Sequence, residues 1–347
     1  MLPRSFHSGL LTHLILLATA LVVSAQHYRI KDVFIGQDFF NSWTWETLQD
    51  PTHGRVNYVD QATAISKNLS YVVDNQFVMR ADSSSVVSIN SRGRDSIRIK
   101  SNEAYGAALM VLDLAHMPEG CATWPAWWTL SAEGPWPVGG EIDIIEGVNL
   151  NSNNAATLHT SSACSMADPR NHKGTATSID CDVAANSNQG CGTKFSRDDS
   201  YGSKFNRGNG GWYVVQRDAA AGIKVWFWPR DDSSLPQSVR YGSPNIDIGP
   251  EWGMPEASFT FENCDYGAHF DAHQVLFDLT FCGDWAGSTF LSSGCGVVSC
   301  DEYVDKNPDK FQNAYWAINS MRVYTPEDHG NGRPHMRPFD LVHDIFN

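Results

Sequence analysis

Residues 139–147 read Gly139-Gly140-Glu141-Ile142-Asp143-Ile144-Ile145-Glu146-Gly147. This segment combines a β-branched apolar run with three carboxylates between glycine breaks, which predicts a β-strand. Side chains of a strand alternate between its two faces, so Glu141 and Asp143 share one face. Glu146 follows Glu141 by five positions, an odd number, and a regular strand would point it the other way. One extra residue in a β-bulge returns Glu146 to the common face.

Short strand-like runs continue on both sides of this segment, between clusters of Gly, Asn, Asp and Pro. They lie at residues 96–100, 107–114, 212–216, 223–228, 258–261, 275–281 and 321–324. Such spacing favours an all-β sandwich or barrel. One helix is predicted at residues 308–317, with Asn307 as N-cap and Pro308 in the first helical position. Residues 151–211 are rich in Asn, Ser, Gly and Asp, which predicts long loops pinned by two cysteines.

The two ends of the chain differ in character from the part between them. Residues 14–23 form an apolar run after Arg4 and His7, and small residues lead to Ala25. This pattern predicts a secretory signal peptide at residues 1–25, and the run is shorter than the roughly 20 residues that a membrane span needs. Residues 326–347 are polar and predict a C-terminal tail. We therefore expect one domain at residues 26–325 in a secreted, extracellular protein that has no membrane anchor.

The eight cysteines fit an oxidising compartment, because an even number after a signal peptide indicates up to four disulfides. Sequence alone leaves the pairing open. Cys181 with Cys191, and Cys295 with Cys300, lie close enough along the chain to form local bridges. Asn68-Leu69-Ser70 is a sequon that predicts a glycosylated, exposed loop at Asn68.

Charge and composition limit the possible partners. The chain has 347 residues, with 39 acidic against 25 basic side chains, a formal charge of −14. A nucleic-acid binder needs a basic stripe to replace counterions, so this balance argues against one. It also argues against a polybasic membrane-surface protein. With 42% hydrophobic residues the chain can bury a sizeable core.

The three carboxylates at residues 141–146 suggest chemistry, although an acidic solvent-facing strand is the plain alternative. Carboxylates packed on one face repel one another, which costs stability unless a reaction uses them. Retaining glycoside hydrolysis needs two carboxyl groups about 5–5.5 Å apart, close to the reach of neighbours on one strand face. A metal site is the competing use, but the motif contains no His and lacks the loop spacing of a calcium-binding hand.

Aromatic residues surround the motif in the sequence. The apolar faces of sugar rings stack on indoles, so some of the twelve tryptophans are expected to face a polysaccharide, while others belong to the core. The candidates are Trp128, Trp136 and Trp285. His159 begins the next strand-like run, where an adjacent antiparallel strand can bring it near Glu146 to tune that group, unless it is a structural histidine.

The sequence resembles glycoside hydrolase family 16, specifically the fungal laminarinase-type endo-β-1,3(4)-glucanases. Six segments carry the resemblance, which extends to about Tyr324: 50–58 (DPTHGRVNY), 121–128 (CATWPAWW), 139–149 (GGEIDIIEGVN), 157–160 (TLHT), 210–213 (GGWY) and 281–287 (FCGDWAG). The resemblance implies a β-jelly-roll sandwich of two antiparallel sheets with a concave substrate cleft. It further implies that Glu141 is the nucleophile, Glu146 the general acid/base and Asp143 an assisting carboxylate.

The expected activity is therefore endo-hydrolysis of β-1,3-glucans, including mixed-linkage or β-1,6-branched ones, with retention of configuration. A transglycosylase on the same scaffold and a non-catalytic glucan-binding lectin are the alternatives. A lectin has no need for the intact carboxylate set, which argues against it. We expect a monomer that requires no cofactor. Structural calcium occurs in parts of the family, but no diagnostic ligand set is present here.

Overall fold

The computed structural model describes residues 26–327. The predicted signal peptide at residues 1–25 lies outside the described residues, as does the tail from residue 328 onwards. The last strand, β21 (Tyr315–Pro326), ends one residue beyond the expected domain boundary. Within the described part, no helix is long and apolar enough to cross a membrane.

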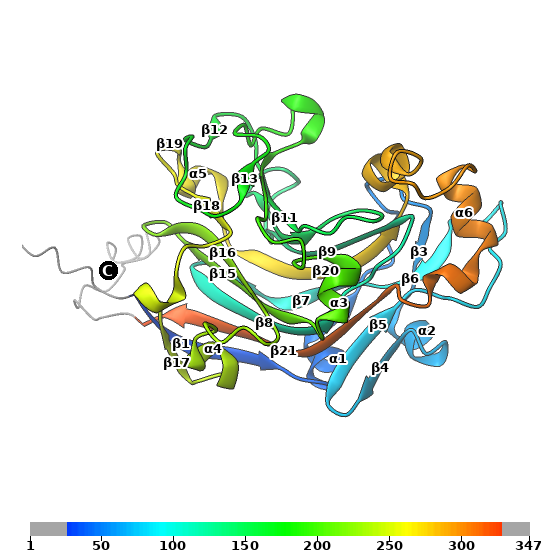
Figure 1. Ribbon diagram of the computed structural model, residues 1–347, viewed down its shortest axis with the longest axis horizontal. Coiled ribbons are helices and arrows are strands. Elements are labelled where there is room, and N and C mark those ends of the chain that lie inside the picture. Colours follow the sequence, from blue (N-terminus) through cyan, green and yellow to red (C-terminus); the bar gives the residue numbers. More distant parts are fainter. Residues whose placement is uncertain (1–25, 328–347) are drawn as a thin grey trace, which may run out of the picture.

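Two large antiparallel sheets are stacked face to face, which confirms the predicted jelly-roll sandwich (Figure 1). The nine-stranded sheet runs in the order β17 (Asn245–Asp247), β1 (His27–Phe34), β21, β8 (Ala108–His116), β15 (Gly211–Asp218), β16 (Gly222–Pro229) and β18 (Ala257–Phe259). Beside β21 it also carries β5 (Gln76–Arg80), which pairs with β4 (Ser70–Val73).

The eight-stranded sheet holds the carboxylate motif near its centre. Its order is β13 (Thr175–Ala176), β14 (Cys191–Lys194), β11 (Ala155–His159), β10 (Glu141–Glu146), β9 (Thr123–Ser131), β20 (His273–Phe281), β7 (Arg98–Tyr105) and β2 (Trp43–Trp45). Two small pairs complete the strands, β12 (Cys164–Ser165) with β19 (Asn263–Cys264) and β3 (Val56–Tyr58) with β6 (Arg94–Ser96). Every predicted strand-like run therefore overlaps at least one strand, although the run at residues 258–261 extends past the end of β18.

The main core lies between the two sheets, and strand alternation decides which side chains enter it. In β9, Trp127 is fully buried and stacks on Phe277 of β20 at 6.0 Å between ring centroids. The other face of the nine-stranded sheet has its own aromatic cluster, in which Trp252 packs edge-on against Trp226 and Trp228. Several tryptophans thus serve packing far from the carboxylate motif, as aromatic side chains do in most cores.

The helices are short. They are α1 (Asp38–Ser42), α2 (Gln61–Ser66), α3 (Gly202–Arg207), α4 (Gln237–Tyr241), α5 (Tyr266–His269) and α6 (Cys300–Lys306), with single turns η1 (Asn186–Asn188), η2 (Pro250–Trp252), η3 (Gly283–Gly287) and η4 (Pro308–Phe311). Of these, α2, α4, α5 and α6 lie toward the periphery of the sandwich (Figure 1).

The predicted helix at residues 308–317 is wrong beyond its first turn. Only η4 is helical, and β21 begins at Tyr315, because Trp316 and Ile318 alternate into the core and pair with β5. The Asn307 side chain caps no helix start there and donates to the Tyr303 carbonyl at the end of α6 instead. The helix α6 itself starts at Ser299, whose hydroxyl accepts from the Glu302 N–H.

All eight cysteines are paired, in the bridges Cys121–Cys295, Cys164–Cys264, Cys181–Cys191 and Cys282–Cys300. The predicted Cys181–Cys191 bridge is confirmed, and with Cys164–Cys264 it pins the long loops of residues 151–211. The predicted Cys295–Cys300 bridge is wrong. The end of β20 delivers Cys282 to the start of α6, where it pairs with Cys300, so Cys295 instead joins Cys121 just before β9.

Candidate active site

The three carboxylates of β10 reach one face of the sheet through a β-bulge, as the odd spacing predicts. Against β9, Asp143 is opposite Trp128, but Ile145 is already opposite Trp127, so Ile144 is the extra residue. The register with β11 shifts at the same place. Glu146 therefore follows the bulge on the same face as Glu141 and Asp143.

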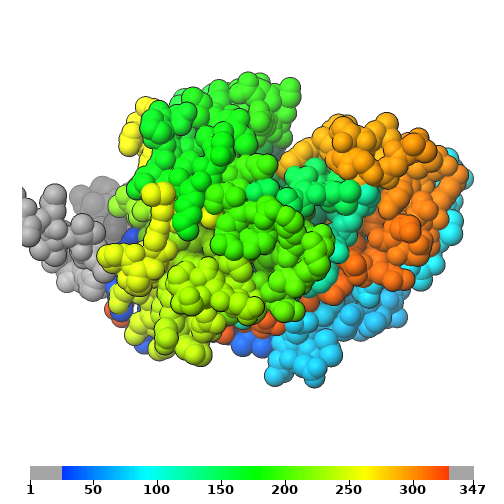
Figure 2. Space-filling model, in the orientation of Figure 1, coloured from blue at the N-terminus to red at the C-terminus, as the bar shows by residue number. Residues whose placement is uncertain are grey.

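This face of the eight-stranded sheet lies in an indentation of the surface. In Figure 2, the loops around residues 160–190 (green) and the segment around residues 285–305 (orange) rise on two sides of a hollow. The neighbouring strands β9 and β11 contribute Trp128 and His159 to the carboxylate face, by their register with Asp143 and Glu141. We call this carboxylate face, with Trp128 and His159 beside it, the groove.

Each glutamate of the motif accepts a hydrogen bond from a tryptophan. The Trp136 indole N–H donates to Glu141 at 3.0 Å, and the Trp124 indole N–H donates to Glu146 at 2.8 Å. Asp143 between them is 4% exposed, and its Oδ2 has no hydrogen-bond partner among the described residues. Each glutamate is thereby oriented by an indole donor, while Asp143 Oδ2 accepts no hydrogen bond from the described residues and has the His159 ring as its neighbour.

The pKa of every carboxyl in the motif is raised. Burial raises the pKa of Glu141 to about 7, partly opposed by the Trp136 hydrogen bond and the charge of Arg98. Burial also raises the pKa of Glu146, and the charge of Glu141 adds to this. Burial, with the charges of both glutamates, raises the pKa of Asp143 well above its ordinary value. The three carboxyls therefore titrate as an interacting group, in which ionising one disfavours ionising the others.

His159 lies beside the carboxylates, with its Nε2 3.4 Å from Asp143 Oδ2. Its Nδ1 is 3.0 Å from the Asn188 side-chain oxygen, which orients the ring. Burial lowers the pKa of His159, partly opposed by the charge of Glu146 and by the hydrogen bond to Asn188. His159 was expected to lie near Glu146. It does lie beside the motif, but its direct contact is with Asp143, and no hydrogen bond joins it to Glu146 among the described residues.

The predicted tryptophans occupy three different settings. Trp136 is 47% exposed beside Glu141, which suits a ligand-facing ring. Trp285 is half-buried and meets Trp124 edge-on at 5.7 Å. Trp128 is only 8% exposed, because the Arg98 guanidinium lies over its ring at 4.9 Å. Trp128 thus forms part of the groove's floor, and Trp136 and Trp285 are the more accessible rings.

Three residues of the site were missed by the sequence analysis: Trp124, Arg98 and Asp278. The Asp278 carboxyl accepts from the Trp128 indole N–H at 3.3 Å and lies 3.5 Å from Arg98. Burial raises the pKa of Asp278 to about 7. A signal for all three was present in the sequence. Trp124 precedes Trp128 by four positions and so shares its strand face, whereas Arg98 and Asp278 are charges inside apolar strands.

Glu141, Asp143 and His159 also form a group with the donor chemistry of a metal site, since one ligand atom of each lies within 4.8 Å of the others. Two oxygens and an imidazole nitrogen suit zinc or another transition ion. Of these, Glu141 is the expected nucleophile of the groove and Asp143 its expected assisting carboxylate. A cation there would occupy the atoms that the proposed reaction requires.

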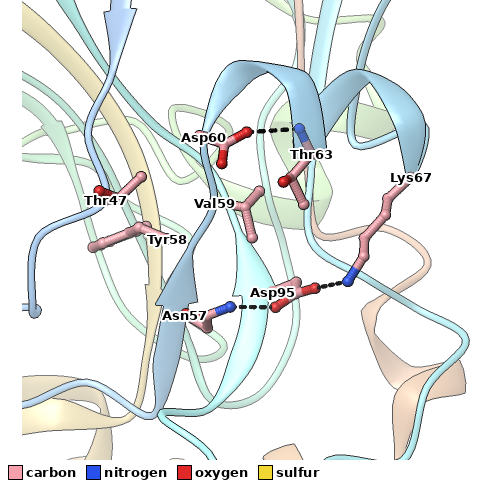
Figure 3. Close-up of a pocket in the computed structure, with 8 residues that line it drawn as sticks. All are labelled: Thr47, Asn57, Tyr58, Val59, Asp60, Thr63, Lys67 and Asp95. Atoms are coloured by element: carbon pink, nitrogen blue, oxygen red, sulfur yellow. Dashed lines mark hydrogen bonds and ion pairs between the residues drawn. The ribbon is translucent and has the colours of Figure 1, made fainter.

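A separate pocket of about 320 Å³ lies away from this groove, between β3, β6 and α2 (Figure 3). Its polar groups satisfy one another, because Lys67 pairs with Asp95 at 2.6 Å and Asp95 accepts from Asn57 at 2.6 Å. Asp60 caps α2 by accepting from the Thr63 N–H. The pocket contains none of the carboxylates of β10, and we assign the chemistry to the groove.

Comparison with known proteins identifies the domain. Residues 43–324 match the family model described as "XgeA-like, catalytic GH16 domain". The chain belongs to glycoside hydrolase family 16. A probable glycosidase of Schizosaccharomyces pombe is 42% identical over 303 residues, which cover 86% of this chain and 70% of that protein. Together with the intact carboxylate motif, this family 16 membership makes the chain a glycoside hydrolase.

Two solved structures share this family 16 fold closely. Laminarinase 16A of Phanerochaete chrysosporium, solved with 6-O-glucosyl-laminaritriose in its donor and acceptor sites, is 48% identical, with a TM-score of 0.83 over 86% of this chain and 100% of that chain. An elongating family 16 β-1,3-glucosyltransferase is 36% identical, with a TM-score of 0.79 over 86% of this chain and 100% of that chain.

Some family 16 relatives are much longer than this chain. A probable endo-1,3(4)-beta-glucanase of Aspergillus fumigatus is 38% identical over 326 residues, which cover 91% of this chain but 48% of that protein. The chain thus spans about half the length of the named glucanases that it matches.

Trp136 offers a first test of this family 16 site, because its indole N–H lowers the pKa of Glu141. Trp136→Phe keeps an aromatic ring and removes the donor. We expect kcat/KM on β-1,3-glucan to fall about tenfold at pH 5, as the loss of a hydrogen bond to a charged group implies, and to recover as the pH rises. The pH profile of kcat/KM measures this effect.

Trp285→Phe is the matched control for Trp136→Phe, since no hydrogen bond joins Trp285 to a carboxylate among the described residues. It should leave the acidic limb of the profile in place. A Trp136→Phe enzyme whose acidic limb coincides with that of the wild type would contradict the role given to the indole.

Proposed function

We propose that the chain is an endo-acting β-1,3-glucanase that hydrolyses its substrate with retention of configuration. Glu141 is the nucleophile, Glu146 the general acid and base, and Asp143 the assisting carboxylate. Mixed β-1,3/1,4 and β-1,6-branched glucans are included in the proposed substrate range. The relatives named as glucanases and laminarinases support this substrate class.

One observation carries the proposal: a bulged strand aligns three carboxyls on one face, and each glutamate accepts a different indole donor. Retaining hydrolysis needs two carboxyls of opposite protonation state close together. Shared burial and mutual repulsion supply that state, because ionising one carboxyl raises the pKa of its neighbours. A module that only binds glucan would have no use for three carboxyls whose mutual repulsion destabilises the fold.

In the first step, the ionised Glu141 attacks C1 of the sugar in the cleaved linkage. The bond from C1 to the glycosidic oxygen breaks as Glu146 gives that oxygen its proton. The reducing-end fragment leaves as an alcohol, and the other fragment becomes an ester of Glu141. Trp136 and Arg98 favour the ionised form of Glu141 before the attack, and the pKa of Asp143 beside it is raised well above its ordinary value by burial and by the charges of both glutamates.

In the second step, Glu146 is ionised and removes a proton from water as the water attacks C1. The ester bond to Glu141 breaks, and Glu141 returns as a carboxylate while Glu146 regains its proton. Two displacements at the same carbon restore the original β configuration.

The proposed activity is tested by following products from laminarin, lichenan and cereal mixed-linkage glucan over time. A ladder of oligosaccharides from laminarin is the expected result, and the lichenan products identify which linkages are cut. Binding to all three polymers without new reducing ends would refute hydrolysis.

A transglycosylase is the second candidate, favoured by the 36% identity to the elongating β-1,3-glucosyltransferase. In that case a sugar hydroxyl replaces water in the second step. Products longer than the starting oligosaccharide, formed at high oligosaccharide concentration, distinguish it from the hydrolase.

The pH dependence of the proposed reaction follows from the raised pKa values. Glu141 must be ionised and Glu146 protonated, and the pKa of each is raised above the ordinary value of 4.5. Both limbs of the kcat/KM profile should therefore lie above pH 4.5, giving an optimum in the mildly acidic to neutral range. An acidic limb at about pH 4 or below, as expected for solvated carboxyls, would contradict this account.

Secretion is part of the proposal, supported by the four disulfides, which form and persist in oxidising compartments. Asn68 is exposed in the turn between α2 and β4, a position accessible to glycosylation. We further propose that the enzyme acts as a monomer and without a cofactor.

A further inference from the structure

The bulge of β10 interrupts the ladder of backbone hydrogen bonds next to the proposed general acid. A bulge leaves the extra residue unpaired, and buried backbone groups need other partners. At this bulge the Glu146 N–H and the Ile144 carbonyl both find their partner in one side chain. Asn154 accepts from the Glu146 N–H through its Oδ1 at 3.0 Å, and its Nδ2 donates to the Ile144 carbonyl at 2.7 Å.

Asn154 is hydrogen-bonded through its backbone to the loop at residues 195–200. It is fully buried, its backbone N–H donates to Ser200 Oγ at 2.9 Å, and its carbonyl accepts from the Phe195 N–H at 2.9 Å. Ser200 Oγ in turn donates to the Arg197 carbonyl at 2.6 Å. Both backbone groups of Asn154 are therefore hydrogen-bonded, which fixes the point from which its side-chain amide reaches the bulge.

We infer that Asn154 is a positioning residue for catalysis, whose amide holds the bulge in the one conformation that turns the Glu146 carboxyl toward the glycosidic oxygen. The inference rests on the proposed role of Glu146. Without this amide, Ile144 and Glu146 relax toward a regular strand, in which the odd spacing turns Glu146 away from Glu141. Glu141 and Asp143 precede the bulge and keep their places.

The inference predicts that replacing Asn154 lowers activity only on substrates whose leaving group needs a proton from Glu146. An ordinary glucan leaves only with a proton from Glu146, whereas a 2,4-dinitrophenyl β-laminaribioside loses a stable phenolate without one. For Asn154→Ala, we expect kcat/KM on laminarin to fall about 100-fold and kcat/KM on the dinitrophenyl glycoside less than fivefold. The ratio of the two is measured on one preparation, so it is independent of the fraction of folded enzyme.

Asn154→Asp is the second variant, because it keeps the acceptor for the Glu146 N–H and replaces the donor by an oxygen facing the Ile144 carbonyl. For Asn154→Asp, the ratio of kcat/KM on laminarin to kcat/KM on the dinitrophenyl glycoside should fall further as the pH rises and the new carboxyl ionises. Asn153→Ala is the matched control, since the Asn153 amide donates to the Phe195 carbonyl at 3.0 Å and touches no group of the bulge. Its ratio should equal that of the wild type.

If Asn154→Ala lost activity equally on both substrates, or lost none on either, the inference would be overturned. The proposed function would still stand as long as the wild-type enzyme cleaves laminarin. A wild type that cleaves neither substrate would instead refute the proposed function. Hydrogen exchange of the wild-type Glu146 amide adds a test that needs no variant. Slow exchange is expected for an N–H held by a buried amide, and exchange as fast as in a surface loop would overturn the inference.

Discussion

Replacing Glu141 with Gln is expected to lower kcat on laminarin by at least about 10⁴-fold, because an amide cannot attack C1 and form the glycosyl ester. The fold should remain intact. Glu141 is half-buried with a raised pKa, so its ionised form is already disfavoured there, and a Gln side-chain oxygen can still accept from the Trp136 indole. Release of reducing ends measures the activity, and thermal unfolding measures the fold.

Glu133→Gln is the matched control for Glu141→Gln, since Glu133 is an exposed glutamate in the turn between β9 and β10. It should keep wild-type activity. A 2-deoxy-2-fluoro glycoside that traps the ester should label Glu141 in the wild type, as found by peptide mass. Near-normal turnover by Glu141→Gln, or a label on another residue, would refute the nucleophile assignment.

Replacing Glu146 with Gln is expected to lower kcat/KM on laminarin by about 10³-fold, because the leaving oxygen then departs without its proton. The dinitrophenyl glycoside should still form the ester on Glu141. That ester should accumulate, because no base activates water in the second step. Added azide needs no base, so it should restore turnover and give a β-glycosyl azide.

The configuration of the azide product separates the two glutamates. Azide attacking the ester of Glu141 gives the β product, whereas azide replacing a missing nucleophile gives the α product. An α-glycosyl azide from Glu146→Gln, or no rescue at all, would contradict the general acid/base role. Glu133→Gln again serves as the exposed-glutamate control, without a response to azide.

The strand pattern around Glu141 carried most of the information needed for the fold and the carboxylates. The odd spacing to Glu146 predicted the bulge, and the register of β10 with β9 confirms it. This worked because alternation along a strand is a local property, which few distant contacts can override. The strand-like runs elsewhere were located for the same reason.

The sequence pattern did not predict features that depend on contacts between residues far apart in the chain. The Cys295–Cys300 prediction used chain proximity, whereas the end of β20 brings Cys282 to Cys300 from 18 residues away. Asn307 and Pro308 are residue types that favour a helix start, yet burial of Trp316 in the sheet makes the residues after the first turn a strand. Tertiary burial outweighed local propensity there.

The environment of each tryptophan was likewise set by packing. Trp128 and Trp136 looked equivalent in the sequence, but Arg98 covers Trp128 while Trp136 stays exposed beside Glu141. Trp124 was not selected, although its indole holds Glu146. Residue type and spacing indicate which face a tryptophan lies on, and only the neighbouring strands decide whether its ring is covered.

The most direct test of the account is proton NMR of laminarin during the first minutes of hydrolysis by the wild-type enzyme. The account predicts new β-configured reducing ends on a ladder of oligosaccharides, with the α form appearing later by mutarotation. Initial α-configured ends would show inversion and contradict the role of Glu141 as nucleophile. Release of glucose alone would contradict endo-action, and the absence of new reducing ends would contradict hydrolysis itself.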